Sequence, residues 1–315
     1  MNNFRIYLYI FLIFVFVIIV GGCKQQITKE EIGYFKKAIE NNKKDYIHKI
    51  IEKGLDINDF KSLGYIPLHE AVKTNNIELI ELFLNNGADI NAINECKQNC
   101  LFLTININTM KFLISKGANI NQVDNFGNIP LAYCLWSYDL SKMYIDNGAN
   151  INNVNKEGYP LLFMALLEGE NNVIVYLINN SKLKIQVCNK KGENAIIWYS
   201  YCGYDCYILD KLLMKGLELN SISKNGVNAL IASVIVSYRF KEKNINKNYR
   251  YITHLIHKGI NINHQDKLGN TALHYAVIRE RPIELLSLLL KYGARKDIRN
   301  NEGKTPLDIA IEKKR

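Results

Sequence analysis

Hydrophobic residues along most of the chain recur at the spacing of short amphipathic helices. In RPIELLSLLLKYGA, residues 281–294, the apolar positions Ile283, Leu286, Leu289 and Leu290 recur at helical spacing, and Gly293 follows where a helix would end. A helix of about ten residues buries little surface alone, so it must pack against its neighbours. The pattern therefore predicts an all-α protein built from stacked pairs of short helices.

Two kinds of glycine-containing segment alternate along the chain with a regular period. The first kind follows a helix, as in NNGADINAI (85–93), SKGANINQV (115–123) and DNGANINNV (146–154). The second kind precedes a helix, as in KLGNTALHYA (267–276) and NEGKTPLDIA (301–310). With Lys97 in the place of one glycine, the second kind recurs after 33, 30, 31, 34, 34, 43 and 34 residues, at Gly64, Lys97, Gly127, Gly158, Gly192, Gly226, Gly269 and Gly303. Internal repetition is thus the dominant feature of the sequence.

A period near 33 residues with the pattern G-x-T-P-L-H-x-A resembles the ankyrin-repeat family. The resemblance covers residues 30–315 and is most complete at residues 64–71 and 269–276. It implies an all-α ankyrin-repeat solenoid of about nine helix-turn-helix units with β-hairpin fingers. The expected units are residues 30–60, 61–93, 94–123, 124–154, 155–188, 189–222, 223–265, 266–299 and 300–315.

Individual residues give more detailed expectations for these units. The hydroxyls of Thr271 and Thr305 are suited to cap the helices that follow them, and Pro306 fits the first helical position. In the family the histidines at positions such as His69 and His274 connect neighbouring loops. Ile66 and Ile129 replace the capping threonine, and residues 97–101 lack both glycine and proline, so the helix starts there are less certain.

The N-terminal segment has a different character. Residues 6–20, IYLYIFLIFVFVIIV, are uncharged and follow Arg5, which is the pattern of an export signal and falls short of the roughly 20 apolar residues of a spanning helix. VGGC (20–23) resembles the lipobox of bacterial lipoproteins, which implies a signal peptide over 1–22, lipidation of Cys23 and a short tether over 23–29. Alternatives are an uncleaved signal anchor and a buried helix.

The chain is basic, with 40 lysines and arginines against 30 acidic residues and a formal net charge of +10. Loss of residues 1–22, which carry one arginine, would leave +9. The 43-residue spacing indicates an insertion near 240–248, inside the basic and aromatic segment SYRFKEKNINKNYRY. Such a segment could contact anionic lipid headgroups or nucleic acid phosphates, although a solvated loop in a lysine-rich protein is the simpler interpretation. On an exported protein, this charge favours acidic proteins or envelope components over nucleic acid.

Catalytic motifs do not stand out. The sequence has no phosphate-binding loop, no HExxH and no G-x-S-x-G, so no catalytic residue, cofactor, metal or small-molecule substrate is predicted. His254, His257 and His264 are the one candidate for a metal-dependent enzyme. Export would permit disulfides between Cys96 and Cys100 or between Cys202 and Cys206, but Cys100 and Cys134 occupy positions that suit small buried residues.

Protein binding is the function that remains. Ankyrin arrays bind proteins through their finger tips and the exposed face of the first helices, and this expectation comes from the resemblance. Transferred to this chain, the candidate contact residues are Leu63, Tyr65, Phe126, Tyr159 and Leu268, which either bind a partner or pack on the adjacent finger. We therefore expect a lipoprotein held in a bacterial envelope, in an unspecified membrane, that binds a protein partner. The alternative is a structural or membrane-surface protein that uses its basic insertion.

Overall fold

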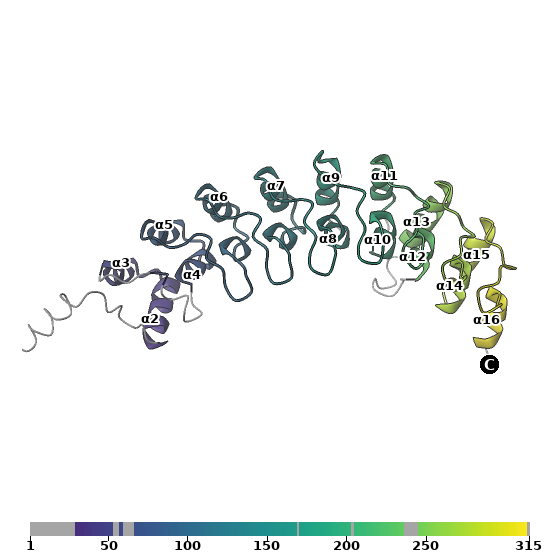
Figure 1. Cartoon of the computed structure of the whole chain (residues 1–315), viewed down its shortest axis with the longest axis horizontal. Helices are drawn as coiled ribbons and strands as arrows, with labels where there is room; N and C mark the ends of the chain where they lie inside the picture. Colours follow the sequence, from purple (N-terminus) through teal and green to yellow (C-terminus); the bar gives the residue numbers. More distant parts are fainter. Residues whose placement is uncertain are drawn as a thin grey trace, which may run out of the picture.

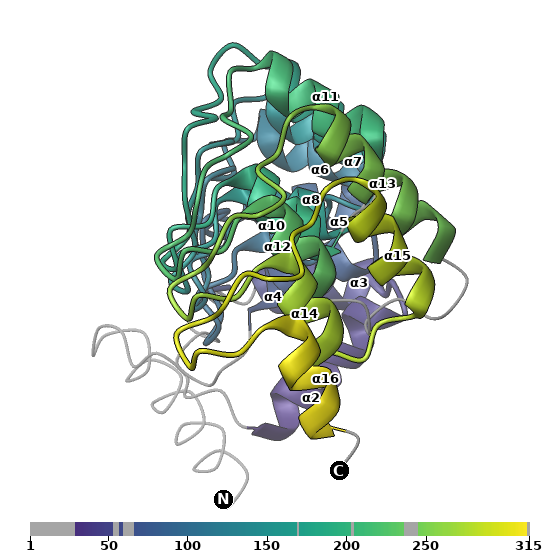
Figure 2. The same cartoon turned by 90° about the vertical axis from the view of Figure 1, so that its right-hand side faces the viewer.

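The computed structural model describes residues 29–52, 57–58, 66–168, 170–202, 205–235 and 245–313. The helices of the described residues form two parallel rows along a curved array (Figure 1). In an end view the rows lie side by side, and the connecting loops project from one edge of them (Figure 2). An all-α solenoid, as the periodicity predicts, is therefore confirmed.

Each unit contributes a first helix to the inner row, and every unit before the last contributes a second helix to the outer row. The first helices are α2 (Lys29–Glu40), α4 (Pro67–Lys73), η2 (Cys100–Phe102), η3 (Pro130–Tyr133), α8 (Leu161–Glu168), α10 (Ala195–Cys202), α12 (Ala229–Ile235), α14 (Ala272–Ile278) and α16 (Pro306–Lys313). The second helices are α3 (Lys44–Glu52), α5 (Ile77–Asn85), α6 (Ile107–Ser115), α7 (Tyr138–Asp146), α9 (Asn171–Asn179), α11 (Cys206–Met214), α13 (Ile245–His257) and α15 (Ile283–Lys291).

A continuous apolar core runs between the two rows. Leu79, Ile80 and Phe83 of α5 are fully buried, as are Leu230 of α12 and Leu289 of α15. The first helices also pack on one another, since α10 contacts both α8 and α12. No unit therefore closes its own core, which is the arrangement expected of stacked repeats.

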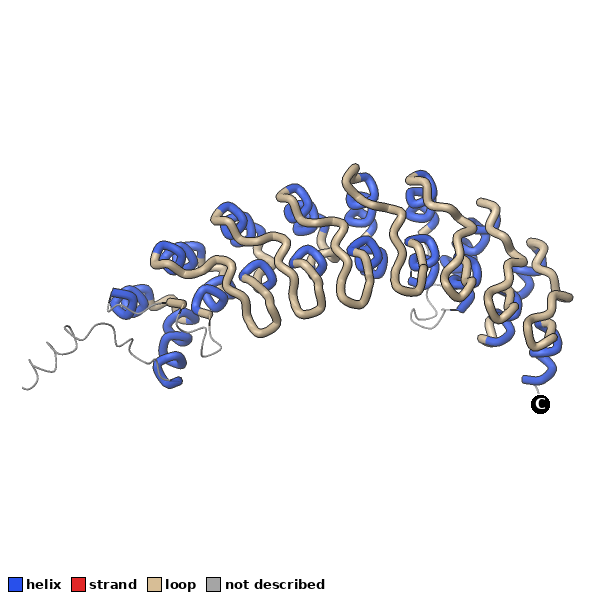
Figure 3. Tube along the Cα trace, in the orientation of Figure 1, coloured by secondary structure: helices blue, strands red, loops and turns tan. Residues whose placement is uncertain are grey.

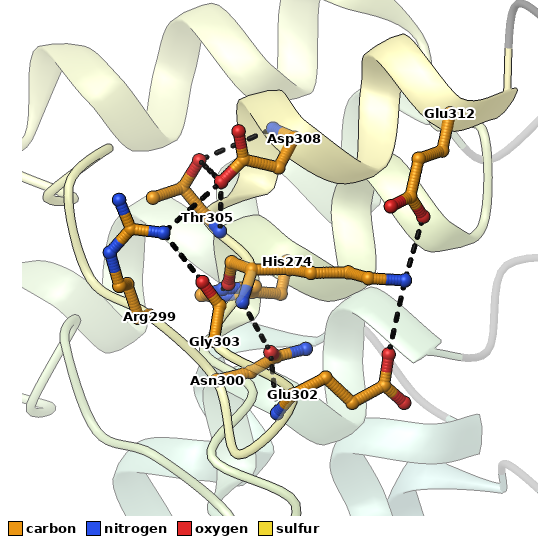
Figure 4. Close-up of polar contacts among 9 residues, drawn as sticks. His274, Arg299, Asn300, Glu302, Gly303, Thr305, Asp308 and Glu312 are labelled. Atoms are coloured by element: carbon orange, nitrogen blue, oxygen red, sulfur yellow. Dashed lines mark hydrogen bonds and ion pairs between the residues drawn. The ribbon is translucent and has the colours of Figure 1, made fainter.

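Caps predicted from the sequence occur at the C-terminal units. Thr271 and His274 form a capping box at the start of α14. At α16, the Asp308 amide donates to the Thr305 hydroxyl over 3.2 Å and the Thr305 amide donates to the Asp308 carboxylate over 2.9 Å (Figure 4). This reciprocal hydrogen bonding satisfies amides that have no partner inside the helix.

The two first helices of the short units are reduced to single 3₁₀ turns. Both η2 and η3 lie in units where the spacing is 30 or 31 residues rather than 33 or 34. The missing residues are taken from the first helix, whereas the second helices α6 and α7 keep nine residues each. The sequence made the helix starts near residues 97–101 and at Ile129 uncertain, and these are the two places where the structure has a shortened first helix.

A row of asparagine side chains connects successive units, and each asparagine lies in the loop that follows a second helix. The Asn121 side chain donates to the Gly148 carbonyl over 3.2 Å and accepts from the Asn150 amide over 2.7 Å, both in the next unit. The same pair of bonds joins each of these side chains to the following unit: Asn58, Asn91, Asn121, Asn152, Asn220 and Asn263. These asparagines therefore hold each unit in a fixed position relative to the next one.

Tyr251 and Arg281 connect the long unit, 223–265, to its two neighbours. α13 begins at Ile245, so the last residues of the segment assigned to the insertion, 245–248, belong to a helix. Tyr251 of the basic and aromatic segment is fully buried, with its hydroxyl 3.0 Å from that of Ser200. Arg281 is also buried and donates to the carbonyls of Val234 and Ile235 at the end of α12. Residues 236–244 lie outside the described residues.

Candidate protein-binding surface

Loops recur along one edge of the array (Figure 3), and the finger at the tip of each is a tight turn of five residues. In the finger 124–128, the Asp124 amide donates to the Asn128 carbonyl over 3.0 Å, and the Gly127 amide donates to the Asp124 carbonyl over 3.0 Å. The Asp124 carboxylate accepts from the amides of Phe126 and Asn128 at 2.9 Å each. One buried side chain therefore holds the whole turn.

This turn is repeated with an Asp, Asn or Ser at its first position. The equivalents of Asp124 that accept backbone amides within their own finger are Asn94, Asn155, Asn189, Ser223, Asp266 and Asn300. These turn residues were not predicted, although each stands three positions before the glycine of its finger, or before Lys97 in the case of Asn94. Lys97 has a φ of 60°, which confirms that it fills the glycine position of its unit.

Neighbouring fingers are hydrogen-bonded directly to one another. The amides of Lys156, Lys224 and Lys267 donate to carbonyls of the preceding finger, at Phe126, Lys191 and Asn225, over 2.8–3.0 Å. Within the described residues, a β-bridge is found only between Val154 and Pro160. The expected β-hairpins are thus reduced to their turns among the described residues, and the finger tips are hydrogen-bonded to the next finger. The result is a continuous row of fingers.

The predicted contact residues divide into two groups. Phe126 and Leu268 sit at finger tips with 63% and 62% of their surface exposed. Tyr159 is half-buried, and its ring centroid lies 4.9 Å from that of Trp198 in the next unit, so it packs within the array. Leu63, Tyr65 and the lipidation candidate Cys23 lie outside the described residues.

Several exposed apolar residues on the finger side were not predicted. Val123, Val154 and Ile222 each directly precede the first residue of a finger. The signal for the three aliphatic residues is their shared position in the repeat. Because apolar side chains at a solvated edge are common in protein interfaces, they widen the candidate surface around Phe126 and Leu268.

Paired aspartate and tyrosine side chains brace two of the fingers. The Tyr133 hydroxyl donates to the Asp124 carboxylate over 2.6 Å, and Tyr275 donates to Asp266 over the same distance. Burial, with a smaller effect of Asp266, raises the pKa of Tyr275 to about 12, so its hydroxyl keeps its proton at physiological pH. These polar groups stabilise the fingers and are not set up for proton transfer.

The histidines have separate partners. His254 Nε2 lies 2.9 Å from Asp210, His264 Nε2 donates to the Gly226 carbonyl over 2.7 Å, and His257 packs edge-on against Tyr292. No cluster of potential metal ligands occurs among the described residues. His69 and His274 donate to the carbonyls of Ala92 and Lys304 in the following loops, which is the role that the family resemblance implies.

The six cysteines in the described part of the chain are free thiols. Burial raises the pKa of Cys100, Cys134 and Cys202 to about 12 each, which keeps these three thiols protonated. Cys100 and Cys134 are buried, as their repeat positions predict, whereas Cys96 and Cys188 are exposed.

The helices of the described residues were also compared with the length and hydropathy of a membrane span. None of them is both long and apolar enough to cross a bilayer.

Comparisons with known proteins agree with this architecture. A family model described as "Ankyrin repeats (3 copies)" matches residues 15–94 and 68–155, and one described as "Ankyrin repeats (many copies)" matches residues 255–310. Similar proteins include putative ankyrin repeat protein L371 of Acanthamoeba polyphaga mimivirus, 29% identical over 84% of this chain and 37% of that protein. The probable 26S proteasome regulatory subunit p28 of Saccharomyces cerevisiae is 29% identical over 42% of this chain and 61% of its own length.

Stacked helix pairs with hydrogen-bonded fingers define a helical repeat protein. The matches identify the repeat, and this chain belongs to the ankyrin-repeat family. Ankyrin repeats are protein–protein interaction modules and are generally non-enzymatic, and no catalytic family is indicated. The chain covers less than two thirds of the length of the two relatives named above.

Proposed function

We propose that this protein binds a protein partner along its row of fingers and that Cys23 holds the array on a membrane as a lipoprotein of a bacterial envelope. The observation that carries the binding proposal is the exposure of Phe126 and Leu268 on braced finger tips. A rigid array loses little conformational entropy when it binds, so several modest contacts can add up to a stable complex.

The anchor rests on the sequence alone. Residues 6–20 supply an apolar segment, and Val20 to Cys23 supply the four lipobox positions. The relatives named above come from a virus and from yeast, so the bacterial assignment depends on these residues. Acyl chains contribute about 0.8 kcal/mol per buried methylene, so a lipidated Cys23 would give stable membrane attachment.

Binding is tested with aspartate substitutions on the finger tips. The full chain is used as bait, and proteins cross-linked to it are quantified by mass spectrometry. Phe126→Asp with Leu268→Asp should lower the yield of specific partners at least about tenfold, since central apolar contacts typically contribute about 2 kcal/mol or more. Met214→Asp is the matched control, because Met214 is 79% exposed at the end of α11 in the outer row. Equal yields from all three proteins would refute binding by the fingers.

The anchor is tested by intact mass. The membrane-extracted chain should begin at Cys23 with added acyl mass, and Cys23→Ala should lose that mass. A chain that begins at Met1 without modification would refute the lipoprotein proposal, while the binding proposal would be unaffected.

A further inference from the structure

Four consecutive fingers carry a lysine at the same position. Lys156, Lys190, Lys224 and Lys267 each directly follow the first residue of their finger, in units five to eight. All four are exposed. The equivalent positions in the flanking units are Asn125 and Asn301, so the row of lysines has a defined beginning and end.

The structure places these lysines in one register. Each lysine lies over the glycine of the preceding finger, since a Cβ atom added at Gly127, Gly158, Gly192 or Gly226 would contact Lys156, Lys190, Lys224 or Lys267, respectively, within about 3 Å. The backbone hydrogen bonds between fingers fix three of the four at their amides. The backbone of each lysine in the row is therefore held by the stack of fingers, while its long side chain places the ammonium group toward solvent.

The charge of the row is not neutralised locally. In the described part of the chain, none of the four ammonium groups lies in an ion pair, and the Lys190 ammonium donates to the Lys156 carbonyl over 2.6 Å. Of the acidic residues in these fingers, Asp266 and Glu193 are buried, and Glu193 accepts a hydrogen bond from the side chain of Asn189 in its own finger. Glu157 is exposed, but exposed Lys191 offsets it. The four fingers therefore carry five lysines against three carboxylates, and two of those carboxylates are buried, so the exposed side chains of the row are predominantly positive.

The surroundings of the lysines favour an acidic polypeptide over a phosphate polymer. Val154, Ile222 and Leu268 are exposed in these fingers or directly before them, with 50%, 51% and 62% of their surface accessible. Aliphatic contacts of this kind suit a polypeptide with apolar side chains. Single-stranded nucleic acid requires stacking on aromatic side chains, and Tyr159, the aromatic residue of these fingers, is packed against Trp198. Arginine, which binds phosphates through bidentate hydrogen bonds, is absent from all four fingers.

We propose that the fingers of units five to eight bind an acidic polypeptide segment that lies along the array, with its carboxylates at the lysine row and its apolar side chains on Val154, Ile222 and Leu268. This inference rests on the proposed protein-binding function and specifies the chemistry of the partner. Each exposed ion pair contributes little alone, so the affinity depends on several fingers acting together.

The test uses the full-length chain and a glutamate-rich copolymer of glutamate and tyrosine as the probe, with binding followed by fluorescence anisotropy at physiological ionic strength. The variant changes Lys156, Lys190, Lys224 and Lys267 to glutamine, which keeps most of the stem that covers each glycine. Its matched control changes Lys111, Lys182, Lys215 and Lys296 to glutamine, because these exposed lysines are outside the fingers and lose the same charge. Circular dichroism checks that both variants remain folded.

The finger variant should bind the copolymer at least about tenfold more weakly than the parent chain, and the control variant should lose no more than about twofold. An equal loss in both variants would mean that only net charge matters and would overturn the proposal. Tighter binding of polyphosphate than of the copolymer, at equal charge concentration, would also overturn it by indicating a phosphate polymer. If partner capture requires Phe126 and Leu268 but neither capture nor copolymer binding requires the lysines, this inference fails and the proposed function stands.

Discussion

At the scale of single residues, the first position of each finger holds the turn through its side chain. Asp124 accepts from two backbone amides and from the Tyr133 hydroxyl, so a buried carboxylate has three donors. Asn and Ser fill the same position elsewhere because any short side-chain oxygen can accept the same amides. Finger shape is therefore kept while the exposed residues of the finger vary, and those residues are the ones available to a partner.

His274 makes stability sensitive to pH. Its Nε2 donates to the Lys304 carbonyl, so Nδ1 is the acceptor for the Thr271 amide at 3.1 Å. Burial lowers the pKa of His274 below its ordinary value of 6.5, and a proton on Nδ1 would also break the capping box. As the pH falls below 6.5 the unfolded chain gains a proton that the folded chain resists, so the free energy of unfolding should decrease until the folded pKa is passed.

The measurement is the urea midpoint between pH 7.5 and pH 5 for the parent chain and for His274→Gln. The variant should be less stable at neutral pH but should depend less on pH over this range. An unchanged pH dependence would show that His274 is not responsible.

Thiol reactivity should divide the cysteines by burial. Under native conditions at neutral pH, a maleimide should modify Cys96 and Cys188 rapidly, because both side chains are exposed. Cys100 and Cys134 should react at least about a hundredfold more slowly, since burial both blocks access and raises the thiol pKa to about 12. Peptide mapping after timed labelling measures both rates. Rapid labelling of Cys134 in the folded chain would contradict the packing of η3.

At the scale of elements, the spacing between repeats predicted the length of the first helices better than the completeness of the repeat motif did. The spacings of 30 and 31 residues indicate units with something missing, and the structure shows that the first helices η2 and η3 are shortened. The motif at α8 and α10 is equally degenerate, yet both are full helices within units of normal length. Lys97 could be placed by spacing alone, and its positive φ confirms that position.

Two finger glycines allow a matched test of contact between neighbouring fingers. Gly269 and Gly303 have nearly equal φ angles of 75° and 74°. An added Cβ at Gly269 would lie 2.7 Å from the Asn301 backbone nitrogen, whereas at Gly303 it would meet nothing within 4 Å. Gly303→Ala should lower the free energy of unfolding by about 1 kcal/mol from backbone strain alone. Gly269→Ala should cost about 2–3 kcal/mol, because the next finger must also shift.

Urea unfolding of both alanine variants provides the comparison. Equal losses would mean that the fingers separate at little cost, and the row of lysines would then not be held in a fixed register.

At the scale of the whole molecule, the repeat period predicted that the units stack. It did not predict which finger residues are exposed on the surface. Phe126 and Tyr159 belong to adjacent fingers, two positions apart in the turn, and are both aromatic, yet Phe126 is exposed and Tyr159 packs on Trp198. That difference depends on which residue the next unit supplies at the contact, and a single repeat motif does not contain it. The asparagine row and the lysine row can be seen in the sequence once the units are aligned on their glycines, but the hydrogen bonds that hold each row come from the structure.

The stacked architecture also predicts how the array responds to local damage. Leu230 of α12 is fully buried and lies between units whose first helices, α10 and α14, both contact α12. Leu230→Ala should cost about 2–5 kcal/mol through the cavity that it leaves. Since each unit contacts only its neighbours, hydrogen exchange should speed up in α10, α12 and α14 while the amides of α4 and α5 keep their protection. Ile311→Ala is the control, because Ile311 is 49% exposed on α16 and should leave exchange in α12 unchanged. A uniform increase in exchange along the chain would instead indicate that the array unfolds as one cooperative body, and local contacts could then not be varied unit by unit to suit a partner.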